Sequence, residues 1–165
     1  MSIQQRHIDE LEADFTGNMV DRYHGLVRAT DSPIEAMMLW AIWYVCDRNS
    51  EHFGLASGNE IPEAIPDGAS VYVIRQCRIG QYRADFAVLF QDGARIVVEC
   101  DGHNFHEKTK QQAQHDKARD RFIQDKGWKV YRFTGGEIFR SPLTCAESVI
   151  NSLYRSSYER QGLTP

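Results

Sequence analysis

The order of apolar and polar positions along the chain predicts an α/β protein. Apolar side chains recur at helical spacing over residues 34–45, which predicts an amphipathic helix. Residues 71–76, 82–90 and 95–101 are short runs rich in β-branched and aromatic side chains, which is typical of strands. Asp92-Gly93 lies between the last two runs and is a turn signal, so these two strands are expected to form a hairpin.

Signals for the ends of elements divide the neighbouring segments. Ser32 has the features of a helix N-cap, with a proline directly after it and Glu35 three residues after the cap. Residues 49–70 are interrupted by glycines and prolines, which predicts a long loop. Residues 106–126 are strongly polar and end before Gly127, a residue typical of helix ends, so they predict another helix.

Three further segments complete the predicted order of elements. Residues 1–30 have apolar side chains at helical spacing and predict a helical lead-in, whereas residues 128–133 alternate as a fourth strand. Residues 141–158 begin with a Ser-Pro pair and predict a last helix. A helix between the third and fourth strands requires a crossover connection, so we predict a mixed four-stranded sheet flanked by helices.

Composition narrows the class of protein. The 165 residues fit one domain, and 42% hydrophobic with 25% charged residues is typical of a folded globular protein. No apolar run reaches the length of a membrane span, and the N-terminus lacks the apolar core of a signal peptide. The four cysteines form no CxxC pair, so reduced thiols and a cytoplasmic protein are expected.

The charge balance is uneven along the chain. The formal net charge is −4, so no overall positive field attracts nucleic acid. Eight of the nineteen Lys and Arg residues nevertheless lie between Lys108 and Arg132. We therefore expect this segment to form a local basic face that can bind along a phosphate backbone.

Acidic side chains stand at the ends of strands that are otherwise apolar. Asp85 lies within the second predicted strand, and Glu99 and Asp101 close the third. Because side chains alternate along a strand, Glu99 and Asp101 share one face and Cys100 points to the other. A carboxylate buried in a sheet needs a cation as its partner, and clustered carboxylates favour a divalent metal such as Mg²⁺.

This joint pattern resembles the PD-(D/E)XK nuclease superfamily. It is most similar to the branch that holds the very-short-patch-repair endonucleases and related small stand-alone or phage-borne endonucleases. The resemblance rests on residues 82–86, on residues 97–102 with His106 after them, and on residues 116–133, and it covers about residues 32–139. It implies a restriction-endonuclease-like αβββαβ core and an endonuclease that uses Mg²⁺, for which Mn²⁺ is expected to substitute.

The resemblance also implies roles for single residues. Asp85 would be the main metal ligand and Glu99 or Asp101 the second, with the backbone carbonyl of Cys100 as a further oxygen. Glu35 matches a glutamate that this branch often places on its first helix, where it assists the metal or the attacking water.

One position departs from the superfamily pattern. Asp101 stands where the superfamily usually has a lysine that steers or activates the attacking water. His106 matches a catalytic histidine of the branch and is suited to proton transfer at neutral pH. Lys108 and Lys110 are alternative sources of the missing positive charge. Two weaker site candidates are His103 and Asp116.

Structural interpretations compete with these roles. Glu35 is also the expected partner of Ser32 in a capping box. Ion pairs with Arg83 or Arg132 are the structural alternative for Asp85 and Glu99. For His106 the alternative is a solvated residue at a helix start.

Three functions therefore stay open at this point. The first is a Mg²⁺-dependent DNA endonuclease, the second a nuclease that acts on RNA, and the third a catalytically weak module that binds nucleic acid. No helix-turn-helix, zinc finger or AT-hook is present, so recognition is expected to use the domain's own loops, a homodimer or an accessory DNA-recognition protein. No membrane partner is expected.

Overall fold

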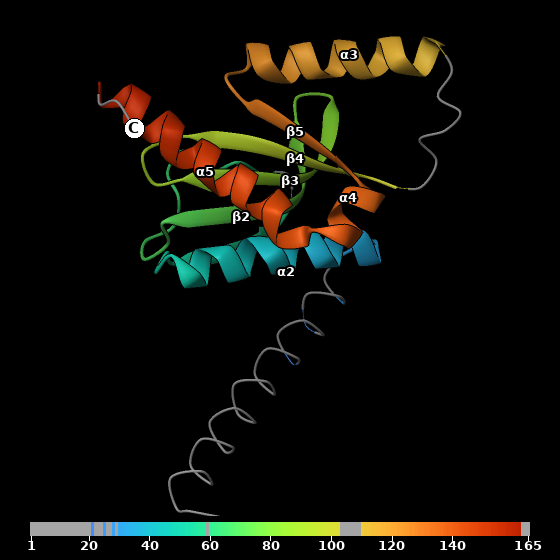
Figure 1. Ribbon diagram of the computed structural model, residues 1–165. Helices are drawn as coiled ribbons and strands as arrows, with labels where there is room; N and C mark the ends of the chain where they lie inside the picture. Colours follow the sequence, from blue (N-terminus) through green and yellow to red (C-terminus); the bar gives the residue numbers. More distant parts are fainter. Residues whose placement is uncertain are drawn as a thin grey trace, which may run out of the picture.

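A mixed five-stranded sheet forms the centre of the computed structural model (Figure 1). Its strands lie in chain order: β1 (Phe53–Ser57), β2 (Val71–Ile79), β3 (Tyr82–Phe90), β4 (Arg95–Asp101) and β5 (Lys129–Thr134). The pairs β1–β2 and β4–β5 are parallel, whereas β2, β3 and β4 are antiparallel neighbours. The expected α/β fold with a mixed sheet is confirmed.

The structure describes residues 30–58, 60–102 and 110–162, together with Asp21, Gly25 and Arg28. Most of the expected lead-in over residues 1–30 lies outside this part of the chain. So do three predicted site residues: His103, His106 and Lys108. Lys110 begins helix α3, but its side chain lies outside the described part.

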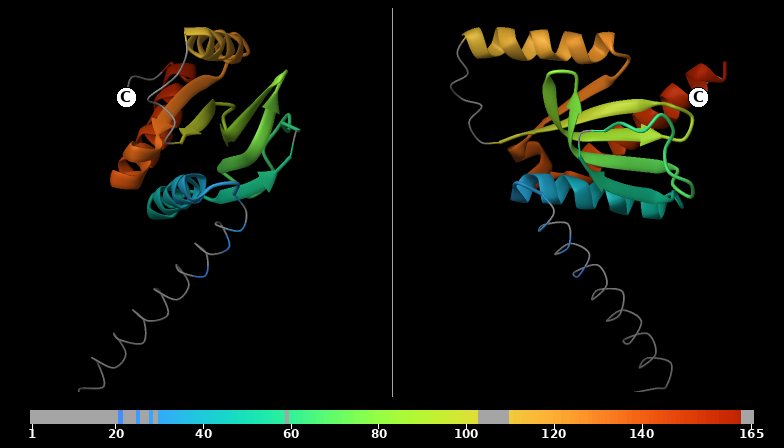
Figure 2. Two further views of the ribbon diagram at one scale, coloured as in Figure 1. Left: turned by 90° about the vertical axis from the view of Figure 1, so that its right-hand side faces the viewer. Right: turned by 180° about the vertical axis from the view of Figure 1, so that it is seen from behind.

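Helices cover both faces of the sheet (Figures 1 and 2). On one face, α2 (Pro33–Arg48) and α5 (Pro142–Arg160) pack together over a large core that includes Leu39, Phe86 and Ile150. We call this the α2/α5 core. On the other face, α3 (Lys110–Asp125) contributes to a smaller core, the α3 core, which consists of Ile74, Cys77, Ile79, Ala84, Ala87, Leu89, Val97, Ile123 and Trp128. No helix in the described part of the chain is long and apolar enough to cross a membrane.

The expected number of strands was wrong by one. Strand β1 lies inside residues 49–70, the segment predicted to be a loop, and pairs with β2 at the edge of the sheet. Its five residues are half-buried or exposed and include Gly54, so they lack the apolar alternation that marks a strand in a sequence.

Another element was missed, the short helix α4 (Gly135–Arg140). It begins with a capping box in which Thr134 and Glu137 hydrogen-bond to each other's backbone N–H groups. The Gly135-Gly136 pair at its start disfavours a helix, although the Thr-x-x-Glu spacing is a helix signal.

Strands β2 and β3 extend beyond both of their neighbours. β1 pairs with β2 only as far as Arg75, and β4 pairs with β3 only from Phe86 onward. Residues 77–84 therefore form a two-stranded arm, which stands out from the sheet beside α3 (Figure 2). Its turn begins at Gly80, where φ is +62°, and the ring of Phe122 in α3 lies against it.

We expect the substitution Gly80→Ala to destabilise the protein by about 1–3 kcal/mol. An added Cβ would lie 2.7 Å from the Phe122 ring and would also be strained at this positive φ. Urea unfolding should show the loss, with Gly102→Ala as control because a Cβ there meets nothing within 4 Å. Equal stability of the two variants would contradict this account of how the arm is held.

Candidate functional site

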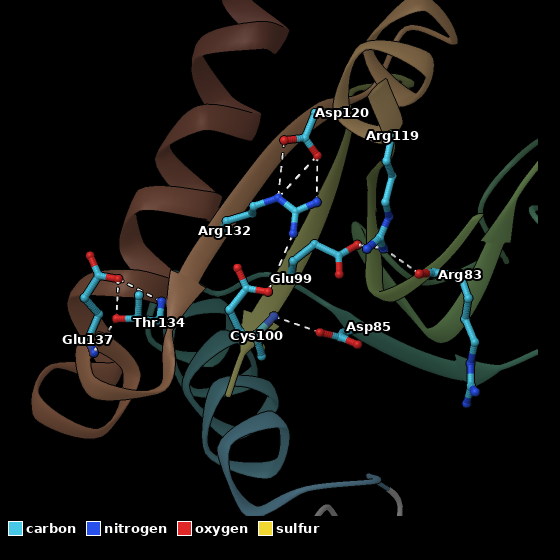
Figure 3. Close-up of polar contacts among 10 residues, drawn as sticks. Arg83, Asp85, Glu99, Cys100, Arg119, Asp120, Arg132, Thr134 and Glu137 are labelled. Atoms are coloured by element: carbon cyan, nitrogen blue, oxygen red, sulfur yellow. Dashed lines mark hydrogen bonds and ion pairs between the residues drawn. The ribbon is translucent and has the colours of Figure 1, made fainter. Parts of the chain in front are cut away.

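The candidate site lies where β3 and β4 separate. Their antiparallel pairing ends at Phe86 and Val98, whereas β4 continues alongside β5 as far as Asp101. At the point of separation the carboxylate of Asp85 accepts a hydrogen bond from the backbone N–H of Cys100 at 2.8 Å (Figure 3). The Asp85 side chain thus satisfies a backbone group that lacks its strand partner.

The backbone of β2 is irregular directly across from Asp85. Gln76 has φ of +52°, in the left-handed region that non-glycine residues rarely adopt. Ile74 and Cys77 both face the α3 core although they are three residues apart, which regular alternation forbids. Strand β3 shifts in the same way, because Ala84 and Ala87 also share that core. In both strands, the alternation of side chains between the two faces of the sheet is therefore interrupted at the site.

Gln76 also holds an acidic side chain at the site. Its side-chain amide donates to Glu35 Oε2 at 2.9 Å, and the Ser32 hydroxyl donates to Glu35 Oε1 at 2.9 Å. Glu35 is buried, and its charge raises the pKa of Asp85. Ser32 caps α2 by accepting from the Glu35 backbone N–H. The Glu35 side chain thus bonds to the Ser32 hydroxyl at the helix start and not to its backbone N–H, as a capping box would require. It lies in an acidic cluster, by which we mean Glu35, Asp85, Glu99 and Asp101.

Glu99 has an arginine partner that the sequence did not indicate. Arg119, on α3, donates through Nη2 to Glu99 Oε1 and to the backbone carbonyl of Arg83 (Figure 3). The side chain of Glu99 is 6% exposed and that of Arg119 is 16% exposed. Arg83, expected as a possible partner, instead makes an exposed ion pair with Asp31 at 3.1 Å.

Asp101 belongs to a second ion-pair group. Arg132 Nη1 lies 3.6 Å from Asp101, and Nη2 of the same arginine lies 2.7 Å from Asp120 on α3. Glu99 also interacts electrostatically with Arg132, whereas Cys100 packs against the α2/α5 core. As expected, Glu99 and Asp101 share one face of β4 and Cys100 points to the other.

Burial and mutual repulsion perturb two of the carboxyls. Burial raises the pKa of Asp85, and Glu35 and Asp101 raise it further, although the N–H of Cys100 and the charge of Arg119 oppose the shift. Burial and the charge of Asp85 raise the pKa of Glu99 to about 7, against the lowering effect of Arg119. The mutual repulsion of the two carboxyls marks a place where a cation would be favoured.

The donor set suits a hard divalent cation. Mg²⁺ is commonly held by only one or two carboxylates, and waters complete its coordination, so two carboxylates such as Asp85 and Glu99 could hold it. Within the described residues, no group of three or more His, Cys, Asp and Glu side chains is arranged around a common metal position. Asp116, a weaker candidate, is half-buried on α3.

Comparison with known proteins relates the chain to a restriction-endonuclease-like family. Residues 60–153 match the model of the restriction-endonuclease-like family REase_MTES_1575. The uncharacterized protein YcjD of Escherichia coli (strain K12) is 35% identical over 83 residues, which are 50% of this chain and 65% of YcjD. The alignment thus spans less than two thirds of that relative. No solved structure matches the chain.

The raised pKa of Glu99 predicts how stability depends on pH. The folded protein holds the Glu99 proton up to about pH 7, whereas the unfolded chain releases it near pH 4.5. The free energy of unfolding without metal should therefore decrease as pH rises through this window. Urea unfolding at pH 5 and pH 8 should show a smaller decrease for Glu99→Gln than for the native chain. An equal decrease would refute the assignment, and Glu63→Gln, at an exposed position, serves as control.

The left-handed backbone at Gln76 makes a second prediction. Gln76→Gly should be more stable than Gln76→Ala by about 1–2 kcal/mol, because only glycine adopts this conformation without strain. Ser50, the other described non-glycine residue with positive φ, should show the same order. Lys129, an exposed strand residue without positive φ, should show the reverse. The measurement is the urea midpoint of the Gly and Ala variants at each of these three positions, six variants in all.

Proposed function

The chain belongs to the restriction-endonuclease-like family REase_MTES_1575, and on that premise we propose that it is a metal-dependent nuclease that cleaves phosphodiester bonds in DNA. Within the wider superfamily we place it near the very-short-patch-repair endonucleases. The observation that carries the proposal is the pair of carboxyls at the opening between β3 and β4, the half-buried Asp85 and the buried Glu99. Burial raises the pKa of both groups, and a bound cation would favour their ionised forms.

Asp85 and Glu99 would hold the metal ion, with Asp101 or the backbone carbonyl of Cys100 as further oxygen ligands. A bound Mg²⁺ would activate water and neutralise charge on the phosphate. Arg119 opposes the effect of burial on Glu99, because its positive charge lowers the pKa that burial raises, and a bound cation would lower that pKa further.

The missing motif lysine is compensated electrostatically in this proposal. Arg119 and Arg132 bring two permanent positive charges to the acidic cluster, beside Glu99 and Asp101. An arginine cannot release its proton at neutral pH, so it can stabilise charge but cannot act as a base. Proton transfer therefore falls to another group, and His106 is the proposed one. Glu35, held by Gln76, would orient the attacking water.

A second candidate function rests on the same ion pairs. Arg119 and Arg132 neutralise Glu99 and Asp101 without any metal, which is how a binding module that has lost catalysis would stabilise this cluster. An RNA-directed nuclease is the third candidate, because the chemistry of phosphodiester hydrolysis is shared.

We expect Mg²⁺ or Mn²⁺ to support cleavage by the native chain when intact, nicked and mismatched DNA duplexes are offered. Asp85→Asn should reduce the rate by at least about 100-fold, since it weakens charge stabilisation worth several kcal/mol. The amide oxygen can still accept from the Cys100 N–H, so the fold should persist. Asp67→Asn makes the same chemical change at an exposed position outside the candidate site and is the matched control.

Calorimetric titration with Mn²⁺ separates the three candidates. Heat of binding with cleavage of DNA supports the proposal, whereas cleavage of RNA alone supports the RNA-directed nuclease. Neither metal binding nor cleavage of any nucleic acid would overturn both enzyme functions and favour the binding module.

A further inference from the structure

Two arginines face each other across the two-stranded arm of residues 77–84. Arg78 of β2 pairs in register with Arg83 of β3, and both are exposed. Like charges directly opposite each other in an antiparallel pair destabilise it.

The arm is braced so that these arginines keep a fixed position. Residues Cys77, Ile79 and Ala84 are buried in the α3 core, and the rings of Tyr82 and Phe122 meet edge to face with centroids 5.4 Å apart. Arg78 and Arg83 alternate with these buried residues, so they lie on the opposite face of the arm.

Few negative charges of the protein oppose the pair. Among the described residues Arg78 makes no ion pair, and Arg83 has only the exposed pair with Asp31, a type of contact that contributes little. Two other basic side chains near the site, Arg119 and Arg132, are already ion-paired within the protein. Their partners are Glu99, Asp101 and Asp120. The arm therefore carries positive charge that is available to a ligand.

The arm also leads directly to the acidic cluster. Arg83 precedes Asp85 by two residues on the same strand, a distance of about 7 Å along the backbone. Two steps of duplex DNA span the same length, at about 3.4 Å of rise each. A phosphate bound by Arg83 would thus lie within a few nucleotides of one placed at Asp85.

We propose that Arg78 and Arg83 form a phosphate-binding site that holds the backbone of a DNA duplex beside the Asp85–Glu99 carboxyls. This inference rests on the proposed nuclease function. It identifies the basic surface that the acidic chain needs for an anionic substrate, and it places that surface on the β2–β3 arm. The sequence alone had indicated the segment from Lys108 to Arg132.

The salt dependence of DNA binding tests the proposal. Anisotropy of a labelled duplex of about 20 base pairs, in EDTA and across a series of salt concentrations, gives the slope of log K against log salt. Each phosphate contact contributes about 0.9 to this slope, so Arg78→Gln/Arg83→Gln should lower it by about 2. At 0.1 M salt the same change weakens binding about 10- to 100-fold.

The control variant Arg155→Gln/Arg160→Gln removes two exposed positive charges elsewhere and gives the same net charge. Both residues lie on α5, outside the arm and outside the segment from Lys108 to Arg132. This control should keep the native slope. A slope reduced equally in both double variants, or in neither, would overturn the arm as the phosphate site.

Two further measurements distinguish the loss of a phosphate site from unfolding and from failure of the proposed nuclease function. The thermal midpoint of Arg78→Gln should be no lower than that of the native chain, since a repulsive pair is removed, so weaker binding would not reflect unfolding. If the native chain cleaves DNA, the arm variant should raise KM and leave kcat within about twofold. A native chain that neither binds nor cleaves DNA would overturn the proposed function, whereas normal cleavage with an unchanged KM in the arm variant would overturn this inference alone.

Discussion

The hydrogen bond from the Cys100 N–H to the Asp85 carboxylate is the contact on which the site depends. It replaces a backbone bond at the point where β3 leaves β4, so the sheet can open without leaving a buried donor unsatisfied. The opening lets β4 continue with β5 while β3 turns into the arm. A single carboxylate thus joins the architecture of the sheet to the chemistry proposed for it.

The arginines around this opening link α3 to the acidic strand. Arg119 and Asp120 are neighbours on α3, yet one binds Glu99 and the other binds Arg132 of β5. Partly buried ion pairs of this kind contribute little net stability, because desolvation offsets much of the attraction. Their consequence is positional: they set α3 over the carboxylates and balance charges that would otherwise repel one another.

The sequence predicted the main part of the fold because strong apolar runs, a hairpin turn and helix caps mark β2 to β5, α2 and α5. It also brought Asp85 next to Glu99, since a short turn between two strands leaves little freedom of register. Two other site features left no such mark. Gln76 adopts a glycine-like backbone without being glycine, and the orientation of Arg119 depends on how α3 docks, which a polar helix does not reveal.

The arm of residues 77–84 lacks a strand neighbour on either side within the described sheet. Unpaired strand edges of this kind can add strands from another molecule and so lead to aggregation. Charged side chains near an edge oppose such pairing, because a second arm would bring four arginines together. Arg78 and Arg83 therefore also oppose the pairing of these strand edges with the same edges of a second copy.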